Sequence, residues 1–102
     1  MKIKYASKKI EELCTVYTHA LKKLNQRRAT ALFLRLKQLK RANSVDDLIR
    51  FHTGRCHRLT GDLNGKFAMD LDHPYRLIFT VELESNSTEF AIIIKILDYH
   101  NH

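Results

Sequence analysis

The sequence predicts an α+β fold in which an N-terminal antiparallel helical hairpin packs on a small, mainly antiparallel β-sheet. Apolar residues recur at three- and four-residue steps in the first half of the chain, and at every second position from residue 67 onward. Helical segments followed by a run of strands are typical of this class. The chain has 102 residues, 44% hydrophobic and 28% charged, which fits one globular domain over residues 1–102 and excludes intrinsic disorder.

Two amphipathic helices are expected in the first half of the chain. The first begins after Ser7, which can cap a helix N-terminus, and its apolar stripe ends at Leu24. Asn25 can break this helix and cap the next one, whose apolar stripe runs from Leu32 to Leu39. The short connection between them predicts an antiparallel hairpin, and the Lys and Arg side chains give that hairpin a basic outer surface.

The second half begins with a short helix and a strand. Ser44 is followed three residues later by an acid, Asp47, which predicts a short helical turn that Gly54 ends. A strand is then expected over residues 55–60. The dipeptide Asn64-Gly65 predicts a tight turn into the next strand.

Three further strands complete the predicted sheet. The alternation of apolar and other residues from 67 to 71 predicts a half-buried strand. Residues 75–81 and 90–97 are rich in β-branched and aromatic side chains, which favour strands. Within the last of these, the apolar run 91–94 indicates an interior strand that is covered on both faces.

The charge of the chain points to a polyanionic partner. Eighteen Lys and Arg stand against eleven Asp and Glu, a formal net charge of +7. Residues 1–50 hold 13 basic and 4 acidic side chains, whereas residues 51–102 hold 5 basic and 7 acidic ones. Binding to a polyanion releases counterions, so we favour it over a solubilising surface or a docking face for an acidic protein.

Several classes of protein and site are excluded. No apolar run approaches the roughly 18–20 residues that cross a membrane, and no signal peptide is visible at the N-terminus. Cys14 and Cys56 are too few for a disulfide framework and are expected to be reduced thiols in the cytoplasm. The chain has no G-x-G-x-x-G, Walker, H-E-x-x-H or C-x-x-C motif, so we expect no cofactor. Asp70 and Asp72 beside His73 could hold a metal ion, but a solvated strand end is the simpler interpretation, and we expect no metal.

Polar residues on the predicted strands form the candidate site. Five of them lie inside or at the end of an apolar strand, where a polar side chain is costly unless it is paired or faces a cleft. They are His57, Arg76, Asp98, Tyr99 and His100. Neighbouring strands can bring all five to one face of the sheet. Each also has a local alternative: a surface histidine, an Arg–Asp ion pair or a frayed C-terminus.

Such a set suits cleavage of RNA without a metal ion. That reaction needs a base for the ribose 2′-OH, an acid for the leaving 5′-oxygen and a cation for the charged phosphorane. Histidine serves either proton transfer, arginine binds two phosphate oxygens, tyrosine stacks on an unpaired base, and aspartate orients an imidazole. Composition alone does not favour this activity over simple RNA binding.

Three segments resemble the HigB branch of the RelE/ParE toxin superfamily. They are residues 56–62 (CHRLTGD), 68–79 (AMDLDHPYRLIF) and 97–100 (LDYH), and the order of helices and strands extends the resemblance over essentially the whole chain. The resemblance implies the toxin of a type II toxin–antitoxin system: a ribosome-dependent endoribonuclease that cuts mRNA in the ribosomal A site and so inhibits translation. It also implies a protein antitoxin, often a HigA-like one with a helix-turn-helix domain.

The resemblance assigns a role to each candidate residue. His57 matches the strand histidine of the family, and either His57 or His100 is the base and the other the acid. Arg76 holds the phosphate, Tyr99 stacks on or orients a base, and Asp98 positions a neighbour. Some relatives carry a lysine where this chain has Thr60, and Arg55 or Arg58 can replace its charge. Two residues, Asn101 and His102, extend beyond the usual ending, and His102 is best explained as a solvated tail.

The basic hairpin would then contact ribosomal RNA, with an association that salt weakens. The candidate RNA-binding residues are Lys22, Lys23, Arg27, Arg28, Lys37, Lys40 and Arg41, together with Arg55 and Arg58 near the strand histidine. Two alternatives remain. One is a ParE-like inhibitor of DNA gyrase, which needs no histidine-rich cluster. The other is a non-catalytic nucleic-acid-binding component of a toxin–antitoxin complex.

Overall fold

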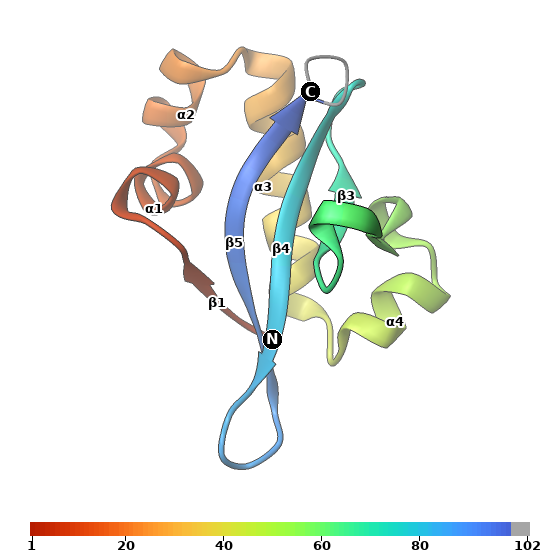
Figure 1. Ribbon diagram of the computed structural model, residues 1–102. Helices are drawn as coiled ribbons and strands as arrows, with labels where there is room; N and C mark the ends of the chain where they lie inside the picture. The colour runs from red at the N-terminus through yellow and green to blue at the C-terminus, as the bar shows by residue number, and fades with distance from the viewer. Residues whose placement is uncertain (99–102) are drawn as a thin grey trace.

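Five strands form one sheet in the order β1-β5-β4-β3-β2, and the α-helices lie on one of its faces (Figure 1). The computed structural model describes residues 1–98. The helices are α1 (Lys8–Thr15), α2 (Tyr17–Lys23), α3 (Gln26–Arg41) and α4 (Val45–Arg50), with short 3-10 turns η1 (Thr53–Arg55) and η2 (Gly61–Leu63). The strands are β1 (Lys2–Tyr5), β2 (His57–Arg58), β3 (Phe67–Asp70), β4 (Tyr75–Leu83) and β5 (Glu89–Asp98). β1 runs parallel to β5 and the other pairs are antiparallel, which confirms the α+β class.

The predicted helix caps are confirmed. The Ser7 hydroxyl accepts a hydrogen bond from the Ile10 N–H at 3.2 Å, and the Asn25 side-chain oxygen accepts one from the Arg28 N–H at 2.7 Å. The Ser44 hydroxyl accepts the Asp47 N–H at 3.2 Å. Each side chain satisfies an N–H that has no partner within the first turn of the helix. The starts of α1, α3 and α4 are therefore encoded locally.

The prediction of one continuous helix between Ser7 and Leu24 was wrong, because Val16 interrupts it. Its backbone is extended (φ −117°, ψ 100°) and separates α1 from α2. Val16 lies in a run of β-branched and aromatic residues, which have reduced rotamer freedom in a helix. The break lets the Tyr17 ring pack edge-on against Phe33 of α3, with 5.2 Å between ring centroids. The contact between Tyr17 and Phe33 thus stabilises a helix break that the spacing of apolar residues does not predict.

An N-terminal strand is present that the sequence analysis did not identify. In β1 the residues Ile3 and Tyr5 alternate with Lys2 and Lys4, and the first pair packs against the core. The strand lies at the edge of the sheet with Ile3 opposite Ala91 of β5. Four residues carry only two alternations, so the sequence signal is weak without the partner strand.

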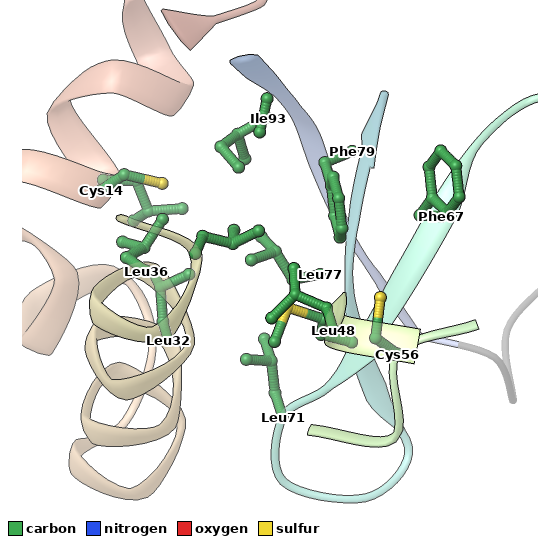
Figure 2. Close-up of a cluster of buried hydrophobic side chains, with 14 of the residues drawn as sticks. Cys14, Leu32, Leu36, Leu48, Cys56, Phe67, Leu71, Leu77, Phe79 and Ile93 are labelled. Carbon is green, nitrogen blue, oxygen red and sulfur yellow. The ribbon is translucent and has the colours of Figure 1, made fainter. Parts of the chain in front are cut away.

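The core lies between the helices and one face of the sheet. Leu32 and Leu36 of α3 face Leu77, Phe79 and Ile93 of the sheet (Figure 2), and all five are at most 3% exposed. In Figure 1 α3 passes behind β4 and β5, with α1 and α2 at one side and α4 at the other. The opposite face, turned toward the viewer, is covered by none of these four helices, and we call it the open face.

Two predictions about the burial of strands, those for residues 67–71 and 91–94, were wrong. In β3, Phe67, Ala68 and Met69 are all buried, although a half-buried strand was expected. Ala68 is a small side chain in register between His57 of β2 and Ile78 of β4, and these larger neighbours shield it. The interior position of β5 is confirmed, but its cover on both faces is wrong among the described residues, since Ile92 remains partly exposed.

The strand expected over residues 55–60 is reduced to the two residues of β2. The chain before it is coiled: His52, Gly54 and Arg55 have φ values of 57°, 57° and 54°. This left-handed conformation is incompatible with an extended strand. The Asn64-Gly65 turn is confirmed by the hydrogen bond from the Lys66 N–H to the Leu63 carbonyl at 3.0 Å.

Among residues 1–98, no helix is both long and apolar enough to cross a membrane.

Candidate functional site

The candidate site lies on the open face, where neighbouring strands bring polar side chains into register. His57 of β2 pairs with Ala68, and Asp70 at the end of β3 pairs with Arg76 of β4. Met69 and Leu77, which alternate with these residues, point into the core beneath the helices. Because successive side chains of a strand point to opposite faces, His57, Asp70 and Arg76 share the open face.

The imidazole of His57 lies between a carbonyl and a guanidinium group. Its Nδ1 is 2.8 Å from the backbone oxygen of Arg55, and its Nε2 is 3.4 Å from Nη1 of Arg76. A carbonyl oxygen only accepts hydrogen bonds and a guanidinium only donates them. The geometry therefore fits the tautomer with its proton on Nδ1 and its lone pair on Nε2, directed toward Arg76.

Asp70 joins the two arginines beside this histidine. Its Oδ2 accepts a hydrogen bond from Nε of Arg55 at 2.6 Å, and its Oδ1 lies 3.2 Å from Nη2 of Arg55 and 3.4 Å from Nε of Arg76. The hydrogen bond to Asp70 and the negative charge of that carboxylate raise the pKa of Arg55. We call Arg55, His57, Asp70 and Arg76 the His57 cluster.

Sequence reasoning missed Asp70 as a member of this cluster. It treated Asp70 as part of a solvated strand end, although the predicted hairpin between residues 67–71 and 75–81 holds the signal. The three residues 72–74 between these strands place Asp70 opposite Arg76, and opposite charges directly across two strands attract. The local alternative of an Arg–Asp ion pair therefore holds for Arg76, and it coexists with the contact to His57.

Arg28 was predicted to be an exposed RNA-binding residue, but its side chain is engaged in contacts within the protein. Its Nε and Nη2 donate to the two oxygens of Asp72, both at 3.0 Å, and its guanidinium lies 3.4 Å from the centroid of the Tyr75 ring. The Arg28 side chain is 16% exposed and that of Asp72 10%. This correction removes Arg28 from the basic surface, because its charge is neutralised inside the protein.

Asp70 and Asp72, the two carboxylates considered as metal ligands, therefore pair with different arginines. Asp70 contacts Arg55 and Arg76 on the open face, and Asp72 contacts Arg28 of α3. Within residues 1–98, no group of three or more His, Cys, Asp or Glu side chains is placed to bind a metal ion.

The remaining predicted catalytic residues lie at the C-terminus. Asp98 is the last residue of β5, and its register partner is Tyr75, whereas Arg76 pairs with Leu97. Strand alternation therefore places Asp98 on the side of Tyr75 and not on that of Arg76, contrary to the expectation of one shared face. Arg76 and Asp98 each have further interactions. Tyr99 and His100 lie outside the described residues, as do Asn101 and His102.

The predicted basic residues divide into a group that is exposed on the helices and residues that pair with acidic side chains. Six of them are exposed on α2 and α3: Lys22, Lys23, Arg27, Lys37, Lys40 and Arg41. We call these six the basic helix surface. α3 packs its apolar stripe against the sheet and contains no acidic residue, so its exposed cations have no acidic partner within the helix. Arg58 is also outside the cluster, because its guanidinium pairs with Asp46 of α4 at 3.1 Å.

The geometry of the chain is shared with solved toxin structures. A YoeB/ParE toxin from Agrobacterium tumefaciens gives a TM-score of 0.62 at 15% sequence identity, over 94% of this chain and 95% of that chain. A YoeB–YefM complex from Staphylococcus aureus gives 0.59 at 18% identity, over 94% of this chain and 93% of that chain. The chain has a RelE-like fold.

A heterotetrameric YoeB–YefM toxin–antitoxin complex, also from Staphylococcus aureus, gives a TM-score of 0.50 at 15% identity, over 93% of this chain and 92% of that chain. Neither a protein-family model nor a curated protein matches the sequence. At these identities the similarity concerns the RelE-like fold, and the activity has to be argued from the site.

Proposed function

We propose that this protein is the toxin of a type II toxin–antitoxin system, a HigB-like ribosome-dependent endoribonuclease that inhibits translation by cutting mRNA in the ribosomal A site. The observation that carries the proposal is the contact between Nε2 of His57 and Nη1 of Arg76, 3.4 Å apart on the open face of a RelE-like sheet. A lone pair beside a fixed cation is what the first step of metal-free RNA cleavage requires.

In the proposed reaction, His57 is the general base. Its Nε2 takes the proton of the ribose 2′-OH while the 2′-oxygen attacks the phosphorus atom. Arg76 binds the non-bridging oxygens and stabilises the charge of the phosphorane. The bond from phosphorus to the 5′-oxygen then breaks, giving a 2′,3′-cyclic phosphate and a 5′-hydroxyl. With His57 as the base, the family resemblance leaves the proton for that leaving oxygen to His100, with Tyr99 stacking on or orienting a base and Asp98 positioning a neighbour.

Binding to the ribosome is assigned to a separate surface. The six cations of the basic helix surface lie on α2 and α3, whereas the His57 cluster lies on η1 and the strands, so we assign mRNA and ribosomal RNA to different residues. Contacts to phosphate groups release counterions, and the association is therefore expected to weaken as salt rises. The protein antitoxin predicted from the sequence has a counterpart in the YoeB–YefM complexes, whose toxins share this fold.

Primer extension on a defined mRNA in a purified translation system tests the proposal. We expect cuts at codon positions with ribosomes and none without them. His57→Ala should lower the cleavage rate at least roughly 100-fold, because it removes the general base. His19→Ala is the matched control: His19 lies on α2, near Glu12, and should leave cleavage unchanged.

The other outcomes separate the alternatives. Cuts without ribosomes retain the endoribonuclease and contradict its dependence on the ribosome. If no cuts appear and translation continues, the proposal fails, and inhibition of DNA gyrase or a non-catalytic binding role takes its place.

A further inference from the structure

We infer that Asp70 is a positioning residue, which holds Arg76 directly and His57 indirectly in the geometry that RNA cleavage needs. This inference rests on the proposed function. Asp70 lies within the segment 68–79 that carries the family resemblance, but it was given no catalytic role there, and it need not touch the RNA. Its place in the structure, opposite Arg76 and within hydrogen-bond distance of Arg55, assigns it the role.

Asp70 fixes the orientation of the Arg76 guanidinium. Its Nε lies 3.4 Å from Oδ1 of Asp70, while its Nη1 lies 3.4 Å from Nε2 of His57. The guanidinium is planar, so contacts at Nε and at Nη1 together fix its rotation. A long side chain has many rotamers in solution, and ordering them in advance removes an entropic cost from phosphate binding. Asp70 thus keeps one N–H group of Arg76 directed at the histidine.

Asp70 also acts on His57, through the backbone of Arg55. Arg55 has a φ of 54°, a left-handed conformation that is unfavourable for a non-glycine residue. In this conformation its carbonyl oxygen lies 2.8 Å from Nδ1 of His57. The two hydrogen bonds from the Arg55 side chain to Asp70, at 2.6 and 3.2 Å, hold Arg55 in place. Asp70 therefore supports the carbonyl that sets the tautomer of His57.

Asp70 is itself held from the helix layer. Nε of Arg35, on α3, donates to the backbone oxygen of Asp70 at 2.7 Å, and Nη1 of Arg35 donates to the Gln38 side chain at 2.9 Å. A Cβ at Gly54 would lie 2.7 Å from Nε of Arg35, so the glycine provides the space for this arginine. A carboxylate that is fixed through its backbone and lies between two cations can transmit position as well as charge.

The test compares Asp70→Asn with Asp47→Asn in the full-length protein. Asparagine keeps the size of the side chain and removes the charge. Asp47 pairs with Arg50 at 2.8 Å on the surface of α4, outside the His57 cluster, and is the matched control. We expect Asp70→Asn to lower the single-turnover rate of ribosomal mRNA cleavage roughly 10- to 100-fold with unchanged ribosome affinity. Asp47→Asn should retain the wild-type rate.

Two further measurements distinguish positioning from a structural role. The ¹⁵N chemical shifts of His57 should report the Nδ1–H tautomer in the wild type and a mixture of tautomers in Asp70→Asn. Asp70→Glu, whose carboxylate can still reach the arginines, should recover part of the cleavage rate. A wild-type rate in Asp70→Asn, or an equal loss in both Asn variants, would overturn the inference.

The nuclear magnetic resonance measurement also separates this inference from the proposed function. If the wild type cuts no mRNA, the proposed function fails, and the His57 spectrum alone decides whether Asp70 fixes the imidazole. Unchanged His57 shifts in Asp70→Asn then contradict the positioning role, and changed shifts support it.

Discussion

Asp70 and Asp72 are separated by one residue, and each holds an arginine from an earlier part of the chain, yet the two pairs differ in almost every other respect. The Arg28–Asp72 pair is bidentate, 16% and 10% exposed, and stacked on Tyr75. It joins α3 to the turn that follows β3. The Asp70 pairs lie on the open face, where the side chains of Arg55, Asp70 and Arg76 are 58%, 31% and 24% exposed.

This difference shows that burial, and not the chemistry of an ion pair, decides what the pair does. A buried pair whose partner is removed leaves an uncompensated charge away from water, and the cost falls on stability. An exposed pair is screened by solvent and contributes little to folding, so its charges stay accessible to a ligand. On this basis we expect Arg28 to contribute more to the stability of the fold than the ion pairs of Asp70 on the open face do.

The largest effect on stability is expected for Arg28→Ala. It leaves the Asp72 carboxylate without its bidentate partner, and the free energy of unfolding should fall by about 3–5 kcal/mol. Urea denaturation measures this, with Arg27→Ala as the control, because the neighbouring Arg27 is exposed and should change stability by about 0.5 kcal/mol or less. A loss below about 1 kcal/mol for Arg28→Ala would contradict the contrast between the two pairs.

An intermediate effect on stability is expected for Gly54→Ala, which tests the contact by which Arg35 of α3 holds the backbone of Asp70. Gly54 has a φ of +57°, and an added Cβ would lie 2.7 Å from Nε of Arg35. Gly61→Ala is the matched control, because Gly61 has a φ of +67° with nothing within 4 Å of the added Cβ. Both variants should lose roughly 1–2 kcal/mol for the backbone conformation. Gly54→Ala alone should also displace Arg35 and lower mRNA cleavage; equal losses in both measurements would refute the role of Arg35.

The smallest effect on stability is expected from the thiol of Cys56, the residue that precedes His57, whose side chain lies on the helix-covered side of the sheet. Cys56 lies among Leu48 and Phe67 (Figure 2), and burial raises the pKa of its thiol to about 11. The pKa of Cys14 rises to about 12 for the same reason. Since both values are raised above the ordinary thiol pKa, the stability that the neutral thiols contribute is present below about pH 9 and lost as pH rises through about 11 and 12.

Urea midpoints of wild type and Cys56→Ala between pH 7.5 and 11 check this sign. The stability advantage of the wild type over Cys56→Ala should narrow as pH increases. An advantage that stays constant over this range would show that the Cys56 thiol is not shielded from water.

The sequence by itself determined the fold class and the local starts of the elements. Ser7, Asn25 and Ser44 cap helices because a side-chain oxygen satisfies an N–H three residues later, an interaction that needs no distant partner. It also singled out His57 and Arg76, because apolar strands rarely hold a charged or polar residue that has no partner; in the structure they lie on β2 and β4, on either side of β3. The sequence led us to expect the two side chains on one face of the sheet, and in the structure Nη1 of Arg76 lies 3.4 Å from Nε2 of His57.

Only the tertiary structure decided how the charges are used. Arg28 and Arg27 are adjacent and identical in type, yet one is neutralised in a buried pair and the other is exposed, since α3 turns one toward the sheet and the other to solvent. The break at Val16 and the pairing of β1 with β5 depend likewise on partners far along the chain. Spacing fixes which residues share a face of one element, whereas burial and pairing arise from the packing of several elements together.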